Sequence, residues 1–158
     1  MNKYLALATL LVGITLNAAL VQCQQLTIQT DGGKQTALTR AEIAALPRTN
    51  VATSVSDTFA GVSLIALLEK TGISLGGSLK GKRLASCLLV EAADGYRVVF
   101  ALPEIDPAFT DKQIVLAYLK NGKPLDEKEG PYRIVIPDEK KMARWIRQVT
   151  TLKIVDVQ

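Results

Sequence analysis

Histidine is absent from the 158-residue sequence, and its absence limits the chemistry that the side chains can perform. Histidine is the commonest metal ligand and the commonest general base near neutral pH. The sequence also lacks a serine beside a candidate base, a zinc-type spacing of ligands and a glycine-rich phosphate loop. We therefore expect no catalytic residue set and no metal-ligand set built from the side chains alone.

Cysteine and clustered positive charge are scarce as well. If Cys23 leaves with the N-terminal segment or carries a lipid, the second cysteine, Cys87, has no partner, and a disulfide framework is excluded. The net charge of +4 comes from basic residues that are spread along the chain without a lysine or arginine block. Nucleic acid is therefore not expected as a partner.

The N-terminal segment has the layout of a secretory signal. Lys3 precedes an apolar run over residues 4–16, and small residues follow up to Ala19. A membrane-spanning helix needs about 20 residues, so this run is short for a span, although its extension to residue 21 leaves an uncleaved anchor as an alternative. We expect export and a periplasmic or secreted location.

The site of processing has two interpretations. Residues 20–23 resemble a bacterial lipoprotein processing box, but Gln22 stands where a small residue is preferred, so lipidation of Cys23 is the alternative to ordinary cleavage. The predicted organisation is a signal peptide over residues 1–23 and one domain over residues 24–158. A membrane is expected as a partner only if Cys23 is lipidated or the signal stays uncleaved.

The rest of the chain predicts an α+β domain. The box from Thr39 to Glu42 starts a short helix, and Ser63 caps an apolar stripe that Gly72 closes. Asp-Gly and Asn-Gly pairs at positions 94 and 121 indicate hairpin turns. Strands are expected over residues 25–30, 51–55, 84–93, 96–102, 114–119, 132–136 and 146–157. These elements predict a mixed, mainly antiparallel β-sheet with two or three short helices.

Five stretches of the chain are informative when they are taken together: residues 59–73, 89–96, 121–125, 130–137 and 141–146. In this order and spacing they resemble the oxidoreductase molybdopterin-binding domain of the sulfite oxidase family. The resemblance covers roughly residues 36–155. It implies the sulfite-oxidase-type molybdopterin-binding fold, a molybdenum–pterin cofactor and redox chemistry at the metal.

The chain departs from that family at the metal ligand. The resemblance places the ligating cysteine between the first helix and the stretch that begins at Phe59, but residues 48–58 contain no cysteine. The histidine and arginine contacts that normally follow the ligand are missing too. Ser54, Ser56 or Cys87 would serve as a substitute only if the fold brings it beside the cofactor, and a structural role is the alternative for Cys87.

The candidate cofactor-binding residues are Lys141, Arg144, Trp145 and Arg133. The resemblance places the first three near a pterin phosphate or a substrate oxyanion, where lysine and arginine pair with an anion by charge-assisted hydrogen bonds. The alternative is a solvated basic turn in which Trp145 anchors the last strand. Arg133 belongs to an expected strand and points either into a pocket or into water.

The sequence thus predicts an exported molybdopterin-binding-like domain without molybdenum catalysis, acting as a small-ligand-binding or accessory module. No cofactor is expected, although the resemblance allows molybdopterin, and the expected partners are a small anion or pterin and a periplasmic protein. Alternatives are a molybdenum–pterin-dependent oxidoreductase with an unusual metal ligand, which leaves the question of enzymatic activity open, and a structural interaction domain. The leader has no arginine pair, which fits export of an unfolded chain without cofactor.

Overall fold

The computed structural model describes residues 25–54 and 56–156. The predicted signal over residues 1–23, and with it the fate of Cys23, lies outside the described residues. Within the described ranges, no helix combines the length and the apolar composition needed to cross a membrane.

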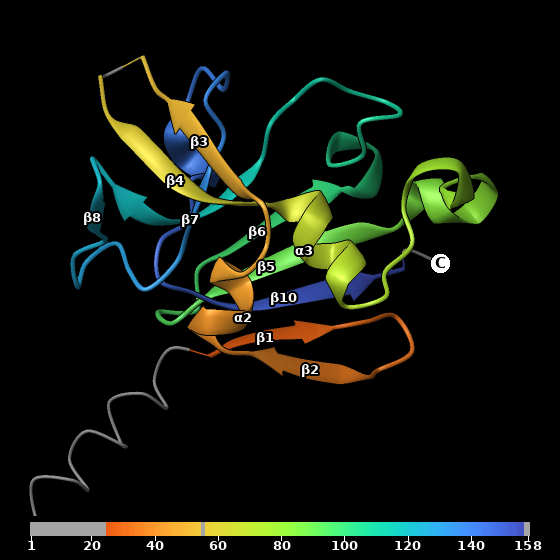
Figure 1. Ribbon diagram of the computed structural model, residues 1–158. Helices are drawn as coiled ribbons and strands as arrows, with labels where there is room; N and C mark the ends of the chain where they lie inside the picture. The colour runs from red at the N-terminus through yellow and green to blue at the C-terminus, as the bar shows by residue number, and fades with distance from the viewer. Residues whose placement is uncertain (1–24, 55, 157–158) are drawn as a thin grey trace, which may run out of the picture.

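The first sheet contains five strands in the order β2-β1-β10-β5-β6. Their bounds are β1 (Leu26–Gln29), β2 (Gln35–Leu38), β5 (Cys87–Ala92), β6 (Arg97–Ala101) and β10 (Val149–Val155). The β1–β10 pair is parallel, and the other three pairs are antiparallel. The strand nearest the end of the described chain therefore lies in the middle of the sheet, between β1 and β5 (Figure 1).

The second sheet is antiparallel and has the order β3-β4-β7-β8, with β9 also paired to β7. Its strands are β3 (Arg48–Ala52), β4 (Thr58–Ser63), β7 (Val115–Lys120), β8 (Lys123–Pro124) and β9 (Arg133–Val135). Strand β9 pairs with the first half of β7 and β8 with its last two residues. In Figure 1 this sheet lies at the upper left and the first sheet below it, while α2 (Arg40–Ala44) is drawn below β3 and α3 (Leu64–Lys70) across β5 and β6.

Both α-helices begin at the caps that the sequence predicts. The Thr39 N–H donates to Glu42 Oε2 at 2.8 Å, and the Glu42 N–H donates to Thr39 Oγ1 at 3.3 Å. The Ser63 hydroxyl oxygen accepts from the Ala66 N–H at 3.3 Å, and Gly72 follows α3 with a φ of +85°. The described residues also form four short 3₁₀ turns: Gly76–Ser78, Gly81–Ala85, Leu102–Glu104 and Met142–Arg144.

Residues from both sheets share one hydrophobic core. On β5, Leu88, Val90 and Ala92 are buried, whereas the alternating residues Cys87, Leu89 and Glu91 are only partly buried on the outer face. The inner residues pack with core side chains of β4, β7 and β9 in one cluster. One core is what a single domain requires.

The α+β class, the mixed and mainly antiparallel pairing and the two short helices are confirmed. The strand pattern was incomplete, because β2, β4 and β8 were not predicted as strands and the strands divide into two sheets. Strand β5 also begins later than expected, since residues 81–85 form a 3₁₀ turn.

Candidate functional site

A cavity of about 750 Å³ opens beside the turn that joins β5 to β6. This volume lies within the range of small-molecule sites. Three segments form its wall: the β5–β6 turn, the approach to β9, and the segment between the last 3₁₀ turn and β10. The lining residues are Ala92, Asp94, Tyr96, Lys128, Glu129, Arg133, Met142, Ala143, Trp145, Ile146, Arg147 and Gln148.

Local hydrogen bonds fix the hairpin side of the cavity. Asp94 Oδ1 accepts from the Tyr96 N–H at 2.9 Å, and Gly95 adopts a φ of +85°. The Tyr96 hydroxyl then donates to the Ala143 carbonyl at 3.0 Å, so the ring bridges the hairpin and the last 3₁₀ turn. The Asp94-Gly95 turn therefore both builds the hairpin and places an aromatic side chain in the cavity wall.

Gln148 joins the other two segments of the wall. Its N–H donates to the Glu129 carbonyl at 3.0 Å, its carbonyl accepts from the Ala93 N–H at 3.0 Å, and its side chain donates to the Glu127 carbonyl at 2.7 Å. These bonds hold Gln148 at a φ of +50°, which is uncommon for a residue with a side chain. Nothing in the local sequence signals this bridging role.

Arg133 is the buried charged residue of the cavity wall, with 7% of its surface exposed. Its Nη1 donates to Glu129 Oε1 at 2.6 Å. The guanidinium carbon lies 5.1 Å from the centre of the Phe59 ring and 5.7 Å from that of Trp145, and both distances permit cation–π attraction. The two rings meet edge to face with their centres 6.2 Å apart.

Charged residues continue from Arg133 to the β3–β4 hairpin. Lys120 Nζ lies 3.6 Å from Glu129 Oε1 and 3.2 Å from Asp57 Oδ2. The Asn121 side chain donates to Asp57 Oδ1 at 2.8 Å, and this hydrogen bond, together with Lys120, lowers the pKa of Asp57. Acidic and basic groups alternate and balance along this row.

Two donors in the wall have no acceptor. Nε of Arg133 and Nε1 of Trp145 are buried and make no hydrogen bond within the described part of the chain. Trp145 is 6% exposed. A buried polar group without a partner costs about 1–3 kcal/mol, so buried donors of this kind are rare and point to an acceptor supplied from outside.

Lys141 and Arg144, although close in sequence, do not line the cavity. Arg144 Nε donates to Glu139 Oε1 at 2.9 Å, and its Nη1 donates to Glu104 Oε2 at 3.2 Å. Burial acts to lower the pKa of Arg144, but its hydrogen bonds with Glu139 and Glu104 outweigh burial and raise it. Lys141 is exposed, so the structure brings together only Arg133 and Trp145 of the four candidate residues.

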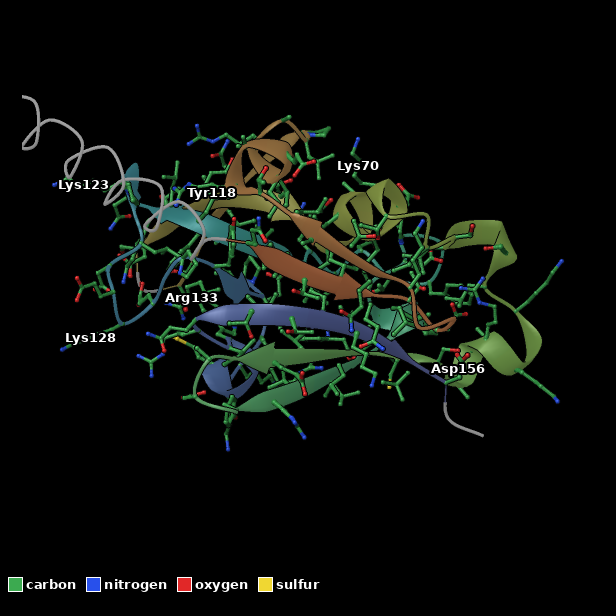
Figure 2. All side chains as sticks on the ribbon, turned by 90° about the horizontal axis from the view of Figure 1, so that it is seen from below. Lys70, Tyr118, Lys123, Lys128, Arg133 and Asp156 are labelled. Atoms are coloured by element: carbon green, nitrogen blue, oxygen red, sulfur yellow. The ribbon has the colours of Figure 1, made fainter. Side chains whose placement is uncertain are left out.

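Cys87 lies far from the cavity. It stands at the start of β5, whereas Ala92, at the end of the strand, lines the cavity, which places them roughly 16 Å apart along the strand. In Figure 2 the cavity residues Arg133 and Lys128 lie toward one end of the molecule, and Asp156, whose charge acts on the Cys87 thiol, lies toward the other. Burial, followed by the charge of Asp156, raises the pKa of the Cys87 thiol.

The residues present do not fit the molybdenum that the family resemblance implies. Ser54 and Ser56 are exposed and absent from the lining of the cavity, and Cys87 points to the outer face of the first sheet. Across residues 25–54 and 56–156, histidine, cysteine, aspartate and glutamate side chains form no cluster of three or more that could hold a metal. The two free donors instead suit an acceptor atom of an organic ligand or an anion.

Sequence reasoning missed Glu129, Tyr96, Met142 and Gln148 as cavity residues. Glu129 precedes Arg133 by four positions, but this spacing has meaning on a helix and here spans a loop. Tyr96 was interpreted through its turn alone. The signal that could have found Tyr96 was the position of an aromatic residue directly after the Asp94-Gly95 turn.

Comparisons with known proteins identify the family and the fold of the chain. Residues 18–158 match the family model described as oxidoreductase molybdopterin binding domain. Among solved structures, the sulfane dehydrogenase SoxCD from Paracoccus pantotrophus is similar, with a TM-score of 0.64 and 20% identity over 85% of this chain and 38% of that chain. This chain thus spans less than half of that protein, and the likeness confirms the sulfite-oxidase-type fold. None of the curated proteins compared with the chain matches it.

Proposed function

Because the chain belongs to the oxidoreductase molybdopterin-binding domain family, we propose that it is an exported member without molybdenum catalysis, which binds a small ligand in the cavity at Arg133 and Trp145. It acts as a binding or accessory module of a periplasmic system. The observation that carries this proposal is the lack of a thiol between residues 48 and 58, where the family resemblance places the metal ligand.

The properties of Cys87 support the loss of the metal. A thiol must lose its proton to ligate a metal, and the raised pKa of Cys87 opposes that loss. The side chain also alternates away from the core face of β5. An oxidoreductase that used Cys87 as a substitute ligand would need it at the other end of the strand.

The cavity supports binding in place of a purely structural role. A structural interaction domain is expected to present an apolar patch without a concave polar site. Here the concave site has three basic lining residues, Lys128, Arg133 and Arg147, and the two donors without acceptors. An anionic or acceptor-rich small molecule fits this combination.

Export rests on the N-terminal pattern. Lys3 and the apolar run over residues 4–16 match a general secretory signal, and the segment has no arginine pair. A chain threaded unfolded through the membrane would carry no bound cofactor. The leader therefore supports the same cofactor-free state as the missing cysteine.

Elemental analysis and native mass spectrometry test this proposal. The full chain is expressed in a host that makes molybdenum–pterin cofactor, with a known molybdenum enzyme produced in the same culture as the positive control. We expect far less than one molybdenum per chain, while the control enzyme is loaded. One molybdenum per chain, with a bound pterin mass, would overturn the proposal.

The same mass spectrum reports the mature N-terminus. A mass that begins near Ala19 or Cys23 without added lipid supports a free exported domain, and a diacylglycerol-sized increase supports a tethered one. Retention of residues 1–23 in the purified protein would contradict cleavage.

A further inference from the structure

The Arg133 guanidinium is paired along only part of its edge. Glu129 bonds Nη1, while Nε has no partner among the described residues. A carboxylate commonly pairs with two neighbouring guanidinium N–H groups at once, and the edge that carries Nε offers this arrangement. The unused edge of Arg133 therefore has the geometry that a planar carboxylate requires.

The Trp145 ring lies beside the Arg133 guanidinium in the same cavity wall. The guanidinium carbon of Arg133 is 5.7 Å from the centre of the Trp145 ring, and each N–H···O bond spans about 2.9 Å. The two donors without acceptors thus belong to neighbouring side chains. A carboxylate that accepts from both would satisfy the two buried donors at the same time.

The rim of the cavity carries two basic side chains, Lys128 and Arg147, against one acidic side chain, Asp94, so its net charge is positive. Lys128 and Arg147 are exposed, they line the cavity, and no ion pair within the described part of the chain includes either of them. At the inner end, by contrast, Glu129 already balances Arg133. This distribution guides an anion inward and favours a singly charged group over a doubly charged one.

The mouth of the cavity also has apolar surface. Tyr96 is 51% exposed and Met142 is 49% exposed, and both line the cavity. An inorganic anion would leave these side chains uncovered, whereas a flat apolar group can pack against the ring and the thioether. The wall therefore suits a ligand with both a charged and an apolar part.

We infer that the cavity binds a small organic carboxylate with a planar apolar body, an inference that rests on the proposed binding function. The carboxylate accepts from Arg133 and from the Trp145 indole N–H, and the apolar body packs against Tyr96 and Met142. Both donor atoms are buried, so the ligand enters by moving a wall side chain.

Trp145 provides a specific readout because it is the only tryptophan in the sequence. Its indole N–H gives one side-chain resonance in a ¹⁵N–¹H spectrum of the purified full-chain protein. Sodium benzoate is the probe. Benzamide serves as its neutral analogue, sodium acetate as a carboxylate without the ring, and sodium sulfate as an inorganic anion. We expect benzoate to shift the resonance to saturation, and the other three to bind at least about tenfold more weakly.

Two cavity variants test the geometry. Arg133→Lys keeps the charge but loses the planar pair of donors, so benzoate affinity should fall about tenfold or more. Glu129→Gln keeps an acceptor for Arg133 and removes the competing charge, so affinity should rise roughly two- to fivefold. Thermal melts establish that each variant is folded, and Glu129→Gln tests the inference even if Arg133→Lys does not fold.

A matched surface pair tests the role of the rim. Lys128→Gln should weaken benzoate binding about twofold, and more at low salt than at high salt. Lys123→Gln, an exposed residue outside the cavity lining, should leave it unchanged. Equal effects of the two variants would show that overall charge, and not the rim, sets the affinity, and would overturn the assignment.

The remaining outcomes are separable from the proposed function. Equal binding of benzoate and benzamide removes the need for a carboxylate, equal binding of benzoate and sulfate removes the need for an apolar body, and no shift with benzoate removes the site. Each of these results overturns the inference on the ligand. The proposed lack of molybdenum catalysis is tested by a separate measurement, and it falls only if the same preparation contains stoichiometric molybdenum.

Discussion

Gly61 marks the closest approach between β4 and β7. A Cβ atom at this position would lie 2.6 Å from Ala117 Cα and closer still to the Leu116 carbonyl oxygen. These are backbone atoms of a central strand, which cannot move without disturbing the register with β4 and β9. The residue therefore has to be glycine, and a glycine inside a strand weakens the sequence pattern of that strand.

Gly61→Ala should destabilise the protein by about 3 kcal/mol or prevent folding, because the added methyl group overpacks the β4–β7 contact. Urea unfolding followed by circular dichroism measures this loss. Gly77→Ala is the matched control, since a Cβ at Gly77 meets no atom within 4 Å, and its effect should stay within about 0.5 kcal/mol. A Gly61→Ala variant as stable as the wild type would contradict the close approach.

Tyr132 couples stability to alkaline pH. Burial raises the pKa of Tyr132 to about 12, whereas an unfolded tyrosine ionises near pH 10. The folded state holds the proton of the Tyr132 hydroxyl more tightly than the unfolded state does. The contribution of this group to the free energy of unfolding is therefore complete below pH 10 and is lost as the pH rises toward 12. The loss amounts to at most about 3 kcal/mol. Ultraviolet titration of tyrosinate should show a component near pH 12 that is missing in Tyr132→Phe; loss of a component near pH 10 would contradict the assignment.

At the scale of elements, the caps of the two helices are local and were therefore predictable. Thr39 with Glu42 and Ser63 with Ala66 lie within one turn of each other, so the sequence contains all the atoms that form each cap. The strands depend on distant partners. Strand β4 exists because β3 and β7 flank it, and β8 is a two-residue pairing against β7.

Ser63→Ala should lower the free energy of unfolding by about 1 kcal/mol, because the Ala66 N–H at the start of α3 loses its acceptor. Thermal denaturation measures the change. Ser74→Ala is the comparison, since Ser74 is exposed and its side chain makes no hydrogen bond with another described residue. Similar losses in both variants would show that the cap does not hold α3.

The Glu42 carboxylate makes α2 sensitive to acid. The hydrogen bond from the Thr39 N–H, followed by that from its hydroxyl, lowers the pKa of Glu42. The ionised Glu42 carboxylate therefore stabilises the folded state at a pH above its pKa in the unfolded chain. This stabilisation is lost as the pH falls through the lower pKa of Glu42 in the folded state. Glu42→Gln should therefore reduce the loss of stability between neutral and acid pH, as followed by urea midpoints; an unchanged pH profile would contradict this coupling.

The site was predictable only in part, because it too depends on contacts between residues that are distant in sequence. Arg133 and Trp145 were identified and do meet in one wall. Arg144, next to Trp145 in sequence, turns toward Glu104 and Glu139 at the end of the short 3₁₀ turn. Glu104 lies forty positions away in sequence, so no local pattern could show that it neutralises Arg144.

At the scale of the whole molecule, the two sheets share one core, and Trp145 lies within it. Its ring meets Phe59 of β4, and the residues after it lead into β10 of the first sheet. A disturbance in either sheet therefore reaches this side chain. The shared core is expected to make unfolding cooperative.

Chemical unfolding should therefore follow a single transition. Trp145 fluorescence reports the junction of the sheets and far-ultraviolet circular dichroism reports both sheets, and their urea midpoints should coincide. Separate midpoints would show that one sheet unfolds before the other. The buried contact of Phe59 with Trp145 makes Phe59→Leu a useful second variant, in which both signals should move together.

The position of β10 also fixes the order in which the fold can be completed. Residues 149–155 separate β1 from β5, so the first sheet cannot close until this last strand is available. If the chain is exported N-terminus first, as proposed above, β1 and β2 can pair as a hairpin, but the edge of β1 that β10 later covers stays unpaired until residues 149–155 have emerged. During that interval the exposed edge of β1 is open to wrong pairing, so the unfinished chain is more prone to aggregation than the folded one.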